Sequence, residues 1–99
     1  AADAVLSHHG NRFVRRVVAE DEAIIRLDLK ETLEEEGYDV VGETGRGDEA
    51  VDLVKQHEPD IAILDIKMPG LDGLSAAREI AGERRAAVLI LTAFSQRDL

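Results

Sequence analysis

Short apolar runs alternate with longer segments in which apolar residues recur every three or four positions. The runs are too short for helices and are bounded by charged residues, glycine or proline. Consecutive apolar residues of this length are typical of strands buried on both faces. We therefore predict four strands, over Phe13–Ala19, Tyr38–Glu43, Ile61–Ile66 and Ala87–Thr92.

The segment between the first two runs, Ala23–Glu36, has the periodicity of an amphipathic helix. Its apolar positions recur at helical spacing, and charged residues occupy the opposite side. Gly37 follows directly and predicts the C-terminus, since glycine readily adopts the left-handed conformation that ends many helices. The predicted inner face consists of Ile25, Leu29, Thr32 and Leu33.

Two further helices are predicted between the later runs. The second has Asp48 as its N-cap and continues through Gln56, with Pro59 just beyond its end. The third spans Leu74–Ala81. The predicted inner positions are Val51 and Val54 in the second helix, and Leu74, Ala77 and Ile80 in the third.

This order of elements predicts an α/β fold with a doubly wound parallel sheet. Apolar strands separated by helices favour right-handed crossovers that cover both faces of the sheet. The chain has 99 residues, of which 44% are hydrophobic, and this is enough for one domain with a modest core. We expect residues 1–12 to form a disordered tail and residues 13–99 to form the domain.

Composition and charge narrow the function. Twelve Lys and Arg against 21 Asp and Glu give a net charge of -9, which disfavours direct binding of nucleic acid. The chain contains no cysteine, so disulfides and thiolate metal sites are excluded. No apolar run approaches the roughly 20 residues of a membrane span, and residues 1–10 do not resemble a signal peptide. We expect a cytoplasmic protein without a membrane partner.

Acidic residues stand where the predicted strands end. Glu20 and Asp21 follow the first strand, Asp65 ends the third and Thr92 ends the fourth. Because the carboxyl ends of parallel strands meet at one edge, these side chains are expected to converge there. Clustered carboxylates repel unless a cation joins them, and their oxygen atoms suit Mg²⁺. Alternatively, Glu20, Asp21 and Glu22 supply negative charge to the start of the first helix.

In combination, these residues form motifs that resemble the receiver domains of two-component response regulators. The resemblance extends from Arg15 to the end of the chain. It implies a flavodoxin-like, CheY-like fold and a signalling domain, not an enzyme. The motifs that carry it are Glu20-Asp21-Glu22, Asp65-Ile66-Lys67-Met68-Pro69-Gly70 followed by Asp72-Gly73, and Leu91-Thr92-Ala93.

The resemblance also implies a role for each site residue. Asp65 would accept a phosphoryl group from a phosphohistidine on a sensor histidine kinase. Glu20, Asp21 and Asp65 would hold Mg²⁺ together with the backbone carbonyl of Lys67. Thr92 would be the switch hydroxyl that moves toward the phosphoryl group. Positioning and charge neutralisation are the main requirements of such a transfer.

Within the family, two stretches are most similar to antiterminator-type (ANTAR) regulators, in which the receiver precedes an RNA-binding helical domain. These stretches are Val18–Ala23 and Leu91–Leu99. RNA antitermination is therefore the expected output, although the output domain is absent from this chain.

The chain departs from the family pattern in two ways. Glu20 stands where many members have Asp, and its longer carboxylate still serves a metal. Family members also have one further strand and helix, and that strand ends in a lysine that pairs with the phosphoryl group. No lysine follows Lys67 here. The last strand would then be an exposed edge, and we expect self-association through Ala87–Phe94.

Three other functions are weighed against phosphoryl acceptance. A pseudo-receiver, which binds proteins without phosphorylation, is consistent with the missing lysine. Phosphatases of the haloacid dehalogenase class place a second acid two residues after the nucleophile, where this chain has Lys67. A flavin-binding flavodoxin-like domain is disfavoured for two reasons. The chain has no Ser/Thr-rich loop after the first strand, and its only aromatic residues are Phe13, Tyr38 and Phe94.

Overall fold

Four parallel strands form one sheet in the computed structural model, which describes residues 14–91. The strand order is β2-β1-β3-β4. In chain order, the elements are β1 (Arg15–Ala19), α2 (Ala23–Glu35), β2 (Asp39–Thr44), α3 (Gly47–His57), β3 (Ile61–Asp65), α4 (Gly73–Gly82) and β4 (Ala87–Leu91). The predicted doubly wound α/β fold is confirmed. The predicted strand ends Phe13 and Thr92 lie outside the described residues.

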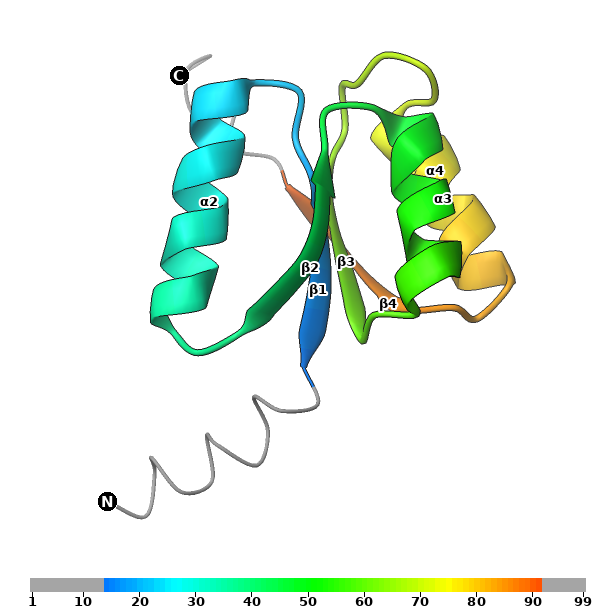
Figure 1. Cartoon of the computed structure of the whole chain (residues 1–99). Helices are drawn as coiled ribbons and strands as arrows, with labels where there is room; N and C mark the ends of the chain where they lie inside the picture. The colour runs from blue at the N-terminus through cyan, green and yellow to red at the C-terminus, as the bar shows by residue number, and fades with distance from the viewer. Residues whose placement is uncertain (1–13, 92–99) are drawn as a thin grey trace.

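The helices cover the two faces of the sheet unequally. Helices α3 and α4 pack side by side on one face, and α2 lies on the other (Figure 1). The main core lies between the sheet and the α3–α4 pair. It is formed by small and branched apolar side chains, with Leu64 and Ile80 the largest of those fully buried. From the sheet come Val17, Ala19, Ala62 and Leu64, and from the helices Ala50, Val51, Val54, Ala76 and Ile80.

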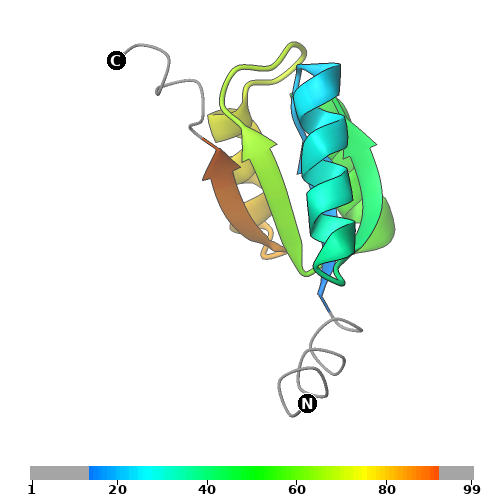
Figure 2. The ribbon, with the colours of Figure 1, turned by 90° about the vertical axis from the view of Figure 1, so that its left-hand side faces the viewer.

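Helix α2 contributes no fully buried residue. Its predicted inner residues Ile25, Leu29 and Leu33 are half-buried, and the prediction was wrong for Thr32, which is exposed. Viewed from this side, α2 lies alone in front of the sheet and leaves β4 uncovered (Figure 2), where Leu89 is exposed. Because α2 has no neighbouring helix on this face, the sides of the helix stay in contact with solvent and only the residues that face the sheet are half-buried.

The C-terminus of α2 confirms the prediction made from Gly37. This glycine has φ 94°, in the left-handed region. Its N–H donates to the carbonyl of Glu34 at 3.0 Å, and the N–H of Tyr38 donates to the carbonyl of Leu33 at 3.0 Å. These two bonds form a Schellman motif, which satisfies carbonyl groups that the helix end would otherwise leave unpaired.

The start of α3 differs from the prediction. The N-cap is Arg46 and not Asp48, which lies in the first helical turn. The Asp48 carboxylate accepts from the Glu49 N–H at 2.8 Å and pairs with the Arg46 guanidinium at 2.9 Å. The helix begins earlier because the N–H of Gly47 donates to the carbonyl of Pro69, on a segment distant in sequence, at 3.1 Å.

Helix α4 begins with a side-chain cap. The Asp72 carboxylate accepts from the Ser75 N–H at 2.8 Å, as is typical of an N-cap. The predicted inward orientation was wrong for Leu74, which is 50% exposed. Its place against the core is taken by Ala76, because the helix presents the face that contains Ala76 and Ile80. Among residues 14–91, no helix is long and apolar enough to cross a membrane.

Candidate functional site

Strand register brings Glu20 and Asp65 together at the carboxyl edge of the sheet. Ala19, the last residue of β1, pairs with Leu64 of β3 and with Thr44 of β2. The next residue on β1 is Glu20 and the next on β3 is Asp65, so the two acids are neighbours. The N–H of Glu20 donates to the carbonyl of Thr44 at 3.0 Å, which extends the β1–β2 pairing into the turn.

The Glu20 carboxyl is buried and strongly influenced by its surroundings. The residue is only 6% exposed, and burial raises the pKa of this carboxyl above its ordinary value. A hydrogen bond donated by the Glu22 N–H at 2.9 Å opposes this rise. The charge of Asp65 and a hydrogen bond with its side chain raise the pKa further. The pair therefore carries an electrostatic cost when both groups are ionised.

Asp65 is held at the end of β3 by its own turn. Its Oδ1 atom accepts from the Ile66 N–H at 2.8 Å, and the residue is half-buried. Three fully buried residues precede it on the strand, Ala62, Ile63 and Leu64. The buried strand and the hydrogen bond from the next residue, Ile66, together fix the direction of the carboxylate, while partial exposure leaves it accessible to a reactant.

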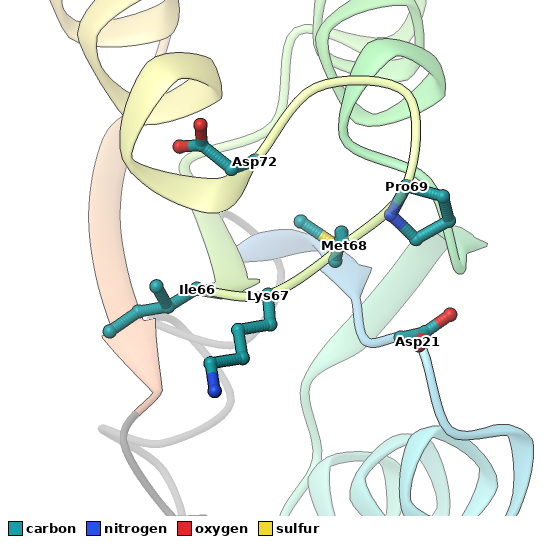
Figure 3. A pocket seen from close by; sticks show the side chains of 6 residues that line it. All are labelled: Asp21, Ile66, Lys67, Met68, Pro69 and Asp72. Atoms are coloured by element: carbon teal, nitrogen blue, oxygen red, sulfur yellow. The ribbon is translucent and has the colours of Figure 1, made fainter.

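Asp21 lies at the rim of the site. It is exposed and lines an open pocket of about 460 Å³ beside the β3–α4 loop. Figure 3 shows Asp21 and Pro69 on the same side of the pocket, with the Lys67 side chain extending away from both. The remaining lining residues are Ile66, Met68 and Asp72. Asp21 follows Glu20 directly in the chain and lies at the rim of this pocket.

The residues present fit a hard divalent cation in type and in charge. Glu20 and Asp65 supply adjacent carboxylate oxygens, and a cation between them would offset both the burial of the Glu20 charge and its repulsion by Asp65, which raise the pKa of Glu20. Among residues 14–91, no group of three acidic or histidine side chains is assembled tightly enough to hold a metal. The third carboxylate, Asp21, is exposed at the rim of the pocket. Thr92, the predicted switch hydroxyl, lies outside the described residues.

Two glycines hold the β3–α4 loop, which carries Lys67, against the rest of the fold. A Cβ atom on Gly47 would lie 1.6 Å from the carbonyl oxygen of Leu71. A Cβ atom on Gly73 would lie 1.8 Å from the carbonyl oxygen of Asp65, and the Gly73 N–H donates to the Ile66 carbonyl at 2.7 Å. Only glycine allows the loop to approach both helix starts this closely.

Sequence reasoning missed Gly47 and also two polar residues near the site. Thr44 ends β2 at the same edge as the acids, and its buried hydroxyl donates to a Glu49 carboxylate oxygen. Applying the strand-end rule to β2 would have found it. Arg26 is one of the charged residues of the first predicted helix, for which the sequence indicated no role in the site, yet its guanidinium donates to the Glu20 carbonyl at 2.8 Å.

A family model matches most of the chain. The response regulator receiver domain model matches residues 17–99. The chain belongs to the response regulator receiver family. The transcriptional regulatory protein PdtaR of Mycobacterium tuberculosis is 60% identical over 85 residues, which are 86% of this chain and 42% of that protein. The chain thus spans less than half the length of this relative.

Solved receiver structures agree with the architecture. The signal receiver domain of the response regulator NarL from Mycobacterium tuberculosis matches with a TM-score of 0.77 and 38% identity, covering 81% of this chain and 66% of that chain. A chain of the CheX-CheY-BeF3-Mg²⁺ complex from Borrelia burgdorferi matches with a TM-score of 0.73 and 26% identity, covering 81% of this chain and 62% of that chain. The described sheet and helices are therefore those of a receiver domain in two-component signalling.

Proposed function

We propose that this receiver domain accepts a phosphoryl group on Asp65 from a sensor histidine kinase in a Mg²⁺-dependent reaction. One observation carries the proposal. Asp65 ends a buried parallel strand beside a second carboxyl, Glu20, whose pKa is raised by burial and by the neighbouring acid. Such a pair at the carboxyl edge of an α/β sheet is suited to a reaction in which a cation neutralises the negative charge and one carboxylate then acts as the nucleophile.

The transfer requires few covalent changes. A carboxylate oxygen of Asp65 attacks phosphorus, the bond from phosphorus to the histidine nitrogen breaks, and the electron pair leaves with the imidazole, which is reprotonated from solvent. Mg²⁺, when bound, neutralises charge on the phosphoryl oxygens. Glu20, Asp21, Asp65 and the Lys67 carbonyl are the groups that would hold it. The Ile66 N–H donates to Oδ1 of Asp65 at 2.8 Å, and this hydrogen bond keeps the carboxylate oriented.

Intact mass after incubation with Mg²⁺ and acetyl phosphate tests the proposal. The wild-type chain should gain one phosphoryl group, and Asp65→Asn should gain none because an amide is not a nucleophile here. Asp52→Asn is a matched control, since Asp52 is an exposed aspartate on α3. It should be phosphorylated like the wild type. Phosphorylation that persists in Asp65→Asn would show that the acceptor is another residue.

We further propose that the phosphorylated domain regulates gene expression through RNA antitermination. Two features support this output: the similarity of Val18–Ala23 and Leu91–Leu99 to ANTAR-type regulators, and the relative named as a transcriptional regulatory protein. In this scheme, movement of Thr92 toward the phosphoryl group alters a nearby surface that an output domain reads. A longer protein that contains this chain and its following residues should bind a terminator-containing RNA more tightly after phosphorylation.

A phosphorylation-independent pseudo-receiver is the alternative function. It is favoured by the lack of a three-ligand group among residues 14–91. Titration of the wild-type chain with Mg²⁺ by calorimetry separates the two functions. A phosphoacceptor domain should bind Mg²⁺ and lose that binding in Asp65→Asn. A pseudo-receiver should show neither Mg²⁺ binding nor phosphorylation.

We also propose that copies of this chain associate through β4. Among the described strands, β4 is an edge made only of apolar residues, and Leu89 is 52% exposed on the side that α2 leaves open. The other edge strand, β2, carries Asp39 and Glu43, which protect an edge from pairing. Sedimentation velocity at rising concentration should show oligomers. Leu89→Lys should reduce them, whereas Leu74→Lys, at a similarly exposed leucine on α4, should not. A monomeric wild type at every concentration would contradict the proposal.

A further inference from the structure

Arg26 joins the two turns that flank the acidic pair. It lies in the second turn of α2, and its side chain is 22% exposed. The Nη1 atom donates to the carbonyl oxygen of Glu20 at 2.8 Å, in the β1–α2 turn. The Nε atom pairs with Oε1 of Glu43, near the end of β2, at 3.3 Å. One guanidinium therefore connects the helix, the turn that presents Glu20 and the neighbouring strand.

The guanidinium occupies a space that Gly45 keeps open. A Cβ atom at Gly45 would lie 2.8 Å from Nη1 of Arg26 and 3.6 Å from the carbonyl oxygens of Glu20 and Asp21. The β2–α3 turn thus passes directly against the β1–α2 turn with the guanidinium in contact with both. This close fit distinguishes Arg26 from Lys30 on the same helix, whose ion pair with Glu34 involves only α2.

The Arg26 bond acts on the peptide that links the two acidic residues. The carbonyl of Glu20 belongs to the peptide group between Glu20 and Asp21, so its orientation sets the directions in which both side chains leave the backbone. On the other side, the N–H of Glu20 donates to the carbonyl of Thr44 at 3.0 Å. The backbone of Glu20 is therefore fixed at its N–H by β2 and at its carbonyl by Arg26.

We propose that Arg26 is a positioning residue that holds the Glu20–Asp21 turn in the geometry required to bind Mg²⁺ beside Asp65. The proposal rests on the proposed phosphoacceptor function. Arg26 itself touches neither the metal nor the phosphoryl group in this scheme. Its guanidinium donates from two nitrogens with fixed relative directions, and a lysine ammonium at the same position lacks that geometry although it keeps the charge.

Calorimetric titration with Mg²⁺ provides the first test, on the whole chain. Arg26→Ala should weaken Mg²⁺ binding roughly tenfold, as is typical when a group that orients metal ligands is removed. Arg26→Lys should weaken it less, and Lys30→Ala should leave it within about twofold of wild type because the ion pair of Lys30 joins two residues of the same helix. Circular dichroism confirms that each variant is folded.

Phosphorylation by acetyl phosphate at varied Mg²⁺ gives a second readout. In Arg26→Ala the Mg²⁺ concentration for half-maximal rate should rise, while the rate at saturating Mg²⁺ stays near wild type because Asp65 is intact. A merely structural loss would lower the saturating rate as well. Equal half-maximal Mg²⁺ concentrations for Arg26→Ala and wild type would overturn the proposal.

Amide hydrogen exchange separates this proposal from the function on which it rests. Without the Arg26 bond, the N–H groups of Asp21 and Glu22 should exchange faster than in wild type, and those of α3 should not change. If wild type neither binds Mg²⁺ nor accepts phosphate, the proposed function fails while faster exchange in Arg26→Ala still supports the positioning of the turn. Unchanged exchange at Asp21 and Glu22 would contradict the role of Arg26 in either case.

Discussion

The two faces of the sheet hold the site in different ways. On the α3–α4 face, small and branched side chains are fully buried, and the β3–α4 loop is fixed by the close approach of Gly47 and Gly73. On the α2 face, no helical residue is buried, and the β1–α2 turn is fixed by polar bonds from Arg26. The comparison indicates that the closed face supplies most of the stability and a rigid loop. On the open face, a few hydrogen bonds hold the β1–α2 turn in place.

Matched leucine truncations on the two faces give the largest expected difference. Leu64→Ala removes a fully buried side chain from the closed face and should lower the free energy of unfolding by about 2–5 kcal/mol. Leu29→Ala, at a half-buried position on α2, should cost about 1 kcal/mol because less apolar surface is buried there. Urea denaturation measures both values. Equal costs would show that α2 contributes as much as the closed face.

Matched glycine substitutions test the rigidity of the loop. Gly47→Ala places a methyl group against the Leu71 carbonyl, and the resulting shift of loop or helix should cost about 1–3 kcal/mol. A Cβ atom at Gly82, at the end of α4, would have no neighbour within 4 Å. Gly82→Ala should therefore stabilise the folded protein slightly. Thermal unfolding compares them. A Gly47→Ala protein as stable as wild type would show that the loop yields without cost.

The helix starts on the two faces provide a smaller, pH-dependent comparison. The cap formed with Ser75 lowers the pKa of Asp72, so the charged carboxylate stabilises the folded state. This contribution is complete above the ordinary pKa near 3.8 and is lost as pH falls through the lowered value. Asp72→Ala should lower Tm by roughly 2–5 °C at pH 7, with a smaller difference below about pH 4.

Glu22→Ala is the matched control for that comparison. Glu22 is the N-cap of α2, but its side chain makes no capping hydrogen bond. Its removal should change Tm by no more than about 1 °C at either pH, because the Glu22 backbone N–H retains its bond to the Glu20 carboxylate. A loss of stability equal to that of Asp72→Ala would indicate that the start of α2 depends on this side chain.

The sequence predicted the order and type of the elements because each signal is local. Apolar runs identified the strands to within one or two residues, apart from the ends outside residues 14–91. Gly37 identified the end of α2, since a left-handed residue is needed there whatever the helix packs against. The inner positions Thr32 and Leu74 were wrong because periodicity gives a helix an apolar face but does not say how much of that face the sheet covers.

The sequence likewise predicted some features of the site and not others. Asp65 and Glu20 were predicted to meet because parallel strands align their carboxyl ends, and the register of β1 and β3 places them side by side. The lack of an assembled three-ligand group among residues 14–91 was not predictable, since side-chain rotamers at strand ends and in turns depend on their neighbours in space. Asp48 was assigned to the wrong role because the contact between Gly47 and Pro69 joins residues 22 positions apart.

By itself, the sequence determined an alternating α/β fold, the acids at the strand ends and membership of the receiver family, because local patterns and strand-end motifs encode them. Only the tertiary structure decided which face of the sheet is closed, which glycines hold the β3–α4 loop and where the Arg26 guanidinium lies. These features depend on distances between segments remote in sequence. Packing sets those distances, and no local pattern of apolar and polar residues specifies them.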